Sequence, residues 1–212
     1  MLLIFFGAFT VALSGAMAPG PFLTMVIARS LVKGPWTGPL TVLGHMILEL
    51  GLLTALVFGV AAFLSKPVFV IVVFLAGGVL LVLMGLDLVI KARGMSLKQD
   101  PAKANRVSAM NPVLAGILVS LSNPFWLIWW LTIGLGYVLK AMDFGIAGLA
   151  AFFSGHILAD LAWYSLVSFS VAAGKKFVTD RIYRTIIAVC GLVLLGFGGW
   201  FLFGGIAKWL SH

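Results

Sequence analysis

The chain has 212 residues, of which 62% are hydrophobic and 9% are charged, so it does not have the composition of a water-soluble domain. Its formal net charge is +8, but no basic stripe interleaved with aromatic residues suggests nucleic-acid binding. The single cysteine, Cys190, excludes an internal disulfide and a thiolate metal cage. The composition therefore predicts an integral membrane protein.

Apolar stretches of about 18 residues or more are long enough to cross the hydrocarbon core of a bilayer as helices. Six such stretches follow one another, near residues 2–28, 38–64, 67–90, 107–139, 144–174 and 185–207. The first has no Lys or Arg before Arg29 and is too long for the apolar core of a signal peptide, so we expect it to remain as a helix. The sequence thus predicts an all-α membrane protein with six transmembrane helices.

One strongly polar segment, residues 92–106, lies between the third and fourth stretches. We expect it to be a cytoplasmic basic linker between two three-helix units, residues 1–91 and residues 107–212. The loops after helices 1, 3 and 5 carry every Lys and Arg except Lys66, Lys140 and Lys208. By the positive-inside rule, both termini of the chain should face away from the cytoplasm.

The two units share a motif. Residues 44–50 read Gly-His-Met-Ile-Leu-Glu-Leu and residues 155–161 read Gly-His-Ile-Leu-Ala-Asp-Leu. A proline break precedes each motif, at residues 18–22 in helix 1 and at residues 122–125 in helix 4. Because each unit has three helices, the second must cross the membrane in the opposite direction. The sequence therefore predicts two inverted three-helix repeats with Pro-interrupted helices 1 and 4.

Inverted repeats with interrupted helices are typical of secondary transporters that bind their substrate near the membrane midplane. In helix 1, Pro19 and Pro21 cannot donate backbone hydrogen bonds, and Gly20 lets the chain turn between them. The helical segment after this break presents N–H groups that suit a carboxylate. In helix 4, Asn123 beside Pro124 supplies a polar amide. A simple kink repaired by neighbouring helices is the alternative, but two breaks at equivalent points favour a role in substrate binding.

Ionisable side chains lie deep inside helices 2 and 5. Glu49 and Asp160 would each cost at least about 2.5 kcal/mol in the hydrocarbon. His45 lies four residues before Glu49, and His156 lies four before Asp160, so each imidazole can meet its carboxylate one turn away. If the repeats pack face to face, the four groups surround one cavity, where they could bind an ammonium group, carry protons or hold a metal. The alternative is that each pair neutralises itself and only joins helices.

Three tryptophans, Trp126, Trp129 and Trp130, follow the break in helix 4. At least one could face the substrate as an aromatic wall, and Trp126 is our candidate.

Several of these features resemble the lysine exporter (LysE) family of translocators, over essentially the whole chain. They are Ala18-Pro19-Gly20-Pro21 in helix 1, Asn123-Pro124 in helix 4 and six helices in a chain of this length. Members of the family export amino acids, including basic ones, homoserine and threonine, across bacterial or archaeal inner membranes, generally driven by the proton gradient. The resemblance implies a multi-pass protein of that cytoplasmic membrane and implies that these five motif residues are site elements: Pro19, Gly20, Pro21, Asn123 and Pro124. Many members have a tyrosine in helix 3 where this chain reads Gly77-Gly78-Val79-Leu80-Leu81, so lysine itself is not implied.

We therefore expect a secondary active transporter that exports basic or small neutral amino acids by proton antiport and alternating access. Glu49 and Asp160 would receive the substrate ammonium or the exchanged proton, and His45 and His156 would tune that exchange near neutral pH. The expected partners are the amino acid, protons and the lipid bilayer, without nucleic acid and without a cofactor. Glycine-rich helix faces serve equally well inside a monomer or between protomers, so a homo-oligomer is left open.

The main alternative is a divalent-metal-ion exporter in which His45, Glu49, His156 and Asp160 hold zinc, manganese or iron. The lack of a His-rich loop and of sulfur ligands weighs against it. A third class is an intramembrane enzyme or an assembly subunit. The chain has no HExxH motif, no nucleophile–base motif and no soluble domain, so we expect no enzymatic activity.

Overall fold

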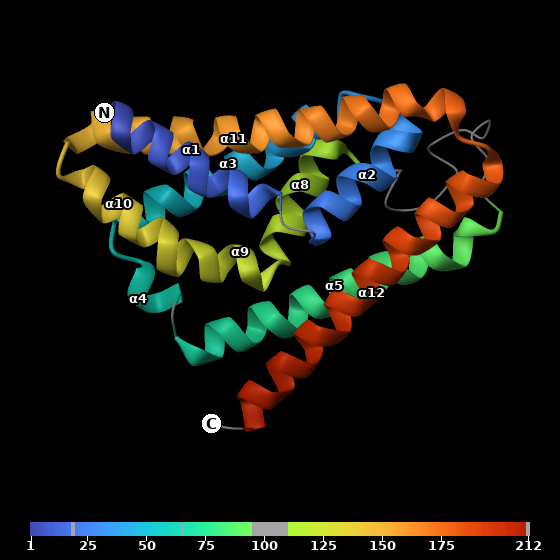
Figure 1. Ribbon diagram of the computed structural model, residues 1–212. Coiled ribbons are helices and arrows are strands. Elements are labelled where there is room, and N and C mark those ends of the chain that lie inside the picture. The colour runs from blue at the N-terminus through green and yellow to red at the C-terminus, as the bar shows by residue number, and fades with distance from the viewer. Residues whose placement is uncertain (18–19, 65, 95–109, 211–212) are drawn as a thin grey trace.

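The computed structural model describes residues 1–17, 20–64, 66–94 and 110–210, and these residues contain helices but no strand (Figure 1). The first half contains α1 (Leu2–Ala16), α2 (Pro21–Lys33), α3 (Thr37–Val57), α4 (Ala61–Leu64) and α5 (Pro67–Ala92). The second half contains α8 (Pro112–Leu121), α9 (Pro124–Trp129), the π-helical turn η1 (Trp130–Gly134), α10 (Leu135–Met142), α11 (Gly145–Gly174), the 3-10 turn η2 (Lys175–Phe177) and α12 (Asp180–Leu210).

Five helical segments of the described chain are long and apolar enough to cross a membrane: Thr37–Val57, Pro67–Ala92, Pro124–Met142, Gly145–Phe177 and Asp180–Leu210. Helices α1 and α2 add a sixth if they form one span, and their axes differ by 72°. The prediction of an all-α, multi-pass membrane protein is therefore confirmed.

Some helix ends differ from those expected. The second span was expected to continue to residue 64, but α3 ends at Val57. Gly59 has a positive φ of 83°, which turns the chain away from the helix axis before α4 begins. The fourth span was expected from residue 107, but α8 begins only at Pro112, where Asn111 caps its first turn by accepting a hydrogen bond from the Val113 N–H.

The long helices α5 and α12 form an antiparallel pair that extends away from the other helices (Figure 1). Their backbones meet at glycines. A Cβ atom added to Gly78 would lie 3.0 Å from the Gly198 carbonyl oxygen, and one added to Gly85 would lie 2.7 Å from the Gly191 carbonyl oxygen. Because glycine has no side chain, the backbones of the two helices can approach closely here. In lipid, where no hydrophobic effect drives helices together, such close van der Waals packing is what holds a helix pair.

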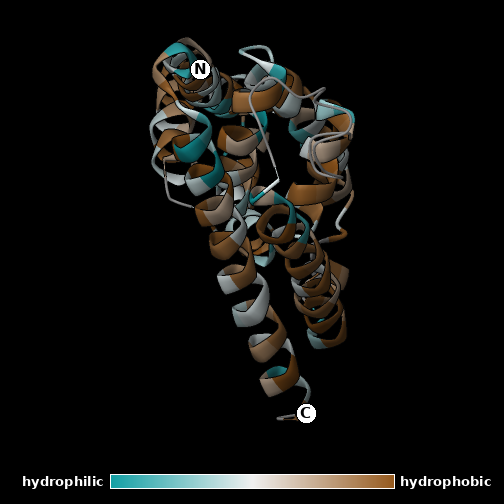
Figure 2. Ribbon diagram, turned by 90° about the vertical axis from the view of Figure 1, so that its right-hand side faces the viewer, coloured by the Kyte–Doolittle hydropathy of each residue, from teal (hydrophilic) through white to brown (hydrophobic). Residues whose placement is uncertain are grey.

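Both helices of this pair consist largely of hydrophobic residues (Figure 2). Large apolar side chains on them are exposed, among them Val72, Leu83, Ile90, Leu192 and Phe203. Apolar side chains on the outside of a chain with this composition match a lipid environment.

Two further helix pairs bring the shared Gly-His motifs to the centre. In the first pair, Gly44 of α3 lies against the backbone carbonyl of Val113 in α8. In the second, Gly155 of α11 lies against the backbone carbonyl of Phe5 in α1. A Cβ atom at either glycine would overlap its neighbour, so both positions require glycine. The histidine after each glycine is buried.

Candidate functional site

Four ionisable side chains from α3 and α11 meet in the interior. The Nε2 atom of His45 lies 3.0 Å from Glu49 Oε1 and 3.4 Å from Asp160 Oδ2. The Nε2 atom of His156 lies 3.0 Å from Glu49 Oε2 and 3.5 Å from Asp160 Oδ2. All four residues are buried, and one nitrogen or oxygen atom of each lies within 4.8 Å of the others. Each imidazole therefore contacts the carboxylate of the other motif as well as its own.

Two indole groups hold the Glu49 carboxylate. Nε1 of Trp126 donates a hydrogen bond of 2.9 Å to Glu49 Oε1, and Nε1 of Trp130 donates one of 2.8 Å to the same atom. The break in helix 4 positions both rings, because the side chain of Asn123 accepts a hydrogen bond from the Phe125 N–H and starts α9 there. Hydrogen bonds to a charged acceptor offset part of the cost of burying Glu49, which is 1% exposed.

A hydroxyl group fixes the proton on His45. The Ser120 hydroxyl donates its only proton to the Gly116 carbonyl oxygen at 2.8 Å. Ser120 Oγ also lies 2.6 Å from His45 Nδ1, so the imidazole must donate this hydrogen bond. In a neutral His45 the Nε2 lone pair then points toward the oxygens of Glu49 and Asp160. A lone pair that faces two ionised carboxylates is repelled by them. The arrangement therefore requires an added proton, on the imidazole or on a carboxyl group, or a cation bound between the imidazole and the carboxylates.

A cavity of about 470 Å³ opens onto these four groups. Aromatic side chains form much of its wall, and the amide side chain of Asn123 also lines it. Phe22 of α2 contacts Tyr164 and His45, with ring centroids 4.7 Å and 5.1 Å apart. Cavities of several hundred Å³ with a few convergent polar groups commonly bind small molecules, and this volume suits a solute of amino-acid size.

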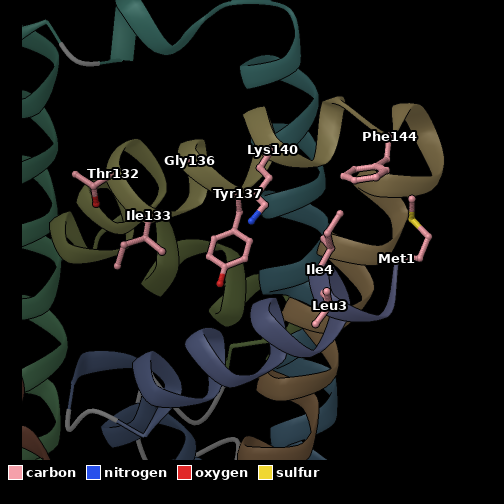
Figure 3. A pocket seen from close by; sticks show the side chains of 9 residues that line it. All are labelled: Met1, Leu3, Ile4, Thr132, Ile133, Gly136, Tyr137, Lys140 and Phe144. Atoms are coloured by element: carbon pink, nitrogen blue, oxygen red, sulfur yellow. The ribbon is translucent and has the colours of Figure 1, made fainter.

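A second cavity, of about 690 Å³, lies between the start of α1 and α10 (Figure 3). Leu3 and Ile4 border it from α1, and Tyr137 and Lys140 border it from α10. The η1 residues Thr132 and Ile133 line both cavities, which therefore adjoin at the π-helical turn. Such turns inside α-helices are frequent at functional sites.

Hydrogen bonds between helices close the opposite end of the bundle. Arg29 and Lys33 of α2 both donate to the Met110 carbonyl oxygen, Lys33 at 2.9 Å. On α11, the Ser168 hydroxyl donates to the Pro35 carbonyl oxygen and accepts a hydrogen bond of 3.1 Å from the Gly38 N–H. These contacts join α2 and α11 to their neighbours, and none of the residues that make them lines the second cavity.

Most of the residues singled out by their sequence pattern reach the central cavity. The structure brings together, at its wall, Glu49, Asp160, His45, His156, Asn123 and Trp126. The others lie at helix starts: Gly20 is the N-cap of α2, Pro21 is its first residue, and Pro124 is the first residue of α9. Pro19 lies outside the described residues.

Some residues at the site were not chosen as site residues. Trp130 was named among the three tryptophans after the break, but Trp126 was the chosen candidate; Tyr164 was not named. Trp130 follows Trp126 by four residues and Tyr164 follows Asp160 by four, so helical spacing could have placed each on the face of a candidate. Phe22 and Ser120 carry no comparable signal. Their positions depend on how α2 packs against α11 and how α8 packs against α3.

Comparisons with known proteins agree with this picture. A sequence model of the LysE type translocator family matches residues 13–205. The chain is also similar to the protein named "Putative amino acid efflux protein YcgF" of Bacillus subtilis (strain 168), with 24% identity over 210 residues that cover 98% of this chain and 99% of that protein. No solved structure matches the chain. Because the family match extends over most of its length, the chain belongs to the LysE type translocators, which are membrane transporters rather than enzymes.

Proposed function

We propose that this translocator exports amino acids, basic or small neutral ones, across the cytoplasmic membrane by proton antiport and alternating access. Membership of the translocator family and the similarity to a protein named for amino acid efflux support the export of amino acids. The observation that carries the mechanism is the buried cluster of two imidazoles and two carboxylates at the wall of a cavity of amino-acid size.

The substrate ammonium group occupies the position where the cluster requires a positive charge, between Glu49 and Asp160. Its carboxylate lies toward Asn123 and toward the first turn of α2, whose N-cap, Gly20, has no side chain to satisfy the N–H groups of that turn. Pro21 and Pro124 are the first residues of α2 and α9, where a missing N–H leaves the helix intact, and Pro19, which lies outside the described residues, completes the proposed set of site prolines. Trp126 contributes to the wall of the cavity and holds Glu49 in place.

Proton coupling follows from the same position. An ammonium group and a proton cannot both supply the charge that the four side chains require, so entry of one favours release of the other. His45 and His156 each contact both carboxylates and can pass a proton between them. Net exchange of substrate for protons is antiport.

The helix contacts support two inverted repeats, at residues 1–91 and 107–212. If the halves are exchanged, the pair α1–α11 becomes the pair α8–α3, and both pairs pack closely. The pair α5–α12 maps onto itself, and Gly78 contacts Gly198 while Gly85 contacts Gly191, as a two-fold axis requires. The linker proposed at residues 92–106 falls largely outside the described residues, which resume at residue 110.

Alternating access uses the two ends of the bundle. With both termini outside the cytoplasm, as the distribution of basic residues predicts, the cavity beside α1 and α10 faces outward, and the hydrogen bonds of α2 and α11 close the cytoplasmic side. Rocking one repeat against the other would open the second end and close the first.

The test is amino-acid efflux from proteoliposomes under an imposed pH gradient, with proton movement followed by an internal pH-sensitive dye. Glu49→Gln and Asp160→Asn should abolish efflux while the protein still inserts. Asp143→Asn is the matched control, because Asp143 is an exposed carboxylate in the turn after α10. Wild-type rates in both cluster variants would refute the assigned roles, and efflux without proton movement would refute antiport.

A further inference from the structure

The central cluster contains buried oxygen atoms with few partners. Glu49 Oε2 and Asp160 Oδ2 have no hydrogen bond within the described part of the chain, although imidazole nitrogens lie 3.0–3.5 Å away. Their residues are 1% and 5% exposed. Buried carboxylates are normally paired or coordinate a metal. We infer that His45, Glu49, His156 and Asp160 together bind a divalent first-row transition-metal ion.

The spacing of the ligand atoms fits such an ion. Four ligands at about 2.0–2.1 Å from a tetrahedral centre lie about 3.3–3.4 Å from one another. His156 Nε2 lies 3.0 Å from Glu49 Oε2, and the Nε2 atoms of His45 and His156 lie 3.4 Å and 3.5 Å from Asp160 Oδ2. His45 Nε2 lies 3.0 Å from the other oxygen of Glu49, Oε1. The four ligand atoms lie within 4.8 Å of one another, so side-chain movements that close the widest of these separations to about 3.4 Å would convert the cluster into a tetrahedral site.

The groups behind the ligands hold them in the orientation that a metal needs. With the Ser120 hydroxyl donating to Gly116, Ser120 Oγ accepts a hydrogen bond from the N–H of His45 Nδ1, and the Nε2 lone pair of a neutral His45 is directed into the cluster. Trp126 and Trp130 occupy Glu49 Oε1 and leave Oε2 for a further ligand. Metal-binding histidines and carboxylates usually have such outer hydrogen bonds, which fix the tautomer and the direction of the ligand atom.

Charge and ligand type indicate the class of ion. Two carboxylates carry a charge of −2 when ionised, and a divalent cation neutralises it while both imidazoles stay neutral. Imidazole ligands suit zinc, copper, iron or nickel, whereas calcium, magnesium and manganese prefer oxygen ligands. The cavity of about 470 Å³ gives an ion access to the cluster.

This inference goes beyond the proposed export function and does not depend on it, because binding can be measured on protein that transports nothing. The full chain is purified in detergent with a tag that lacks histidine, treated with a chelator, and titrated with Co²⁺ and with Zn²⁺. Isothermal titration gives the stoichiometry and affinity, and the visible absorption of bound Co²⁺ reports its geometry.

We expect one ion per chain and an intense absorption band typical of tetrahedral cobalt. His45→Ala and His156→Ala should each remove binding, whereas His212→Ala, which removes the third histidine of the chain, should leave it unchanged. Ser120→Ala keeps all four metal ligands but removes the hydrogen-bond partner of His45 Nδ1, so the metal affinity of this variant should be about 10- to 100-fold lower than that of the wild type. This variant keeps the test decisive if loss of a cluster histidine prevents folding.

Three results would overturn the inference. The first is a wild-type protein that is monodisperse and folded by circular dichroism but binds neither ion. The second is an affinity in Ser120→Ala equal to that of the wild type, and the third is a spectrum of six-coordinate cobalt. Amino-acid efflux is assayed separately. A wild-type protein that exports amino acids but binds no metal would therefore refute the metal site and leave the proposed function standing.

Discussion

Replacing Trp130 with phenylalanine tests how strongly the cluster depends on its indole donors. Trp130 is 0% exposed and donates a hydrogen bond of 2.8 Å to Glu49 Oε1. A hydrogen bond to a charged group contributes about 1.5–3 kcal/mol, and the smaller ring leaves a void that adds to the loss. In a chain of this length, 1 kcal/mol corresponds to about 2–4 °C in Tm. Loss of the hydrogen bond in Trp130→Phe should therefore lower Tm by about 3–12 °C, and the void should lower it further.

Two matched variants separate the hydrogen bond from the ring. Trp126→Phe removes the second donor from a half-buried position, so a similar but smaller fall in Tm is expected. Trp129→Phe makes the same change of ring at a cavity-lining residue whose indole, unlike those of Trp126 and Trp130, makes no hydrogen bond to Glu49. Thermal unfolding of the purified proteins in one detergent, at one scan rate, gives the three Tm values. If Trp129→Phe lowers Tm as much as Trp130→Phe does, the stabilisation comes from ring packing and the argument from the hydrogen bond is refuted.

Three further predictions concern packing, the exit route and competition for the cluster. Gly155→Ala places a Cβ against the Phe5 carbonyl and should cost about 1–3 kcal/mol, whereas Gly174→Ala has no atom within 4 Å and should not lower Tm, so equal Tm values would contradict the packing. Thr132→Phe fills the wall shared by the two cavities and should slow efflux about tenfold, or about 1.4 kcal/mol, without weakening substrate binding in a thermal-shift assay. Zn²⁺ should slow amino-acid efflux because metal and ammonium share one position, and unchanged efflux at saturating Zn²⁺ would argue against a shared position.

The sequence predicts the membrane helices and the central acids well, for a physical reason. Lipid offers no partner to backbone groups or charges, so a span must be a long apolar run, and Glu49 and Asp160 stand out within such runs. Proline also marks helix starts reliably, because its missing N–H costs nothing there: Pro21, Pro67 and Pro124 each begin a helix.

The rest of the site depends on contacts between segments far apart in the sequence. Ser120 resembles any other serine until α8 packs on α3 and places it 2.6 Å from His45 Nδ1. That approach requires Gly44 and Gly116, each of which lies against a backbone carbonyl of the other helix. The π-helical turn that joins the two cavities also has no sequence signal of its own, since its residues are as apolar as those around it.

The duplicated motif does not produce two equivalent acids. Both indole donors come from the segment after the break in helix 4, and both reach Glu49. Asp160 Oδ2 makes no hydrogen bond within the described residues, and the imidazoles of His45 and His156 lie 3.4 Å and 3.5 Å from it. Glu49 Oε1 is therefore held by two hydrogen-bond donors, whereas Asp160 Oδ2 is not, so a cation bound in the cluster would stabilise Asp160 more than Glu49. The two Gly-His motifs carry the same kinds of group, and the side chains that differ around them make the two carboxylates unequal.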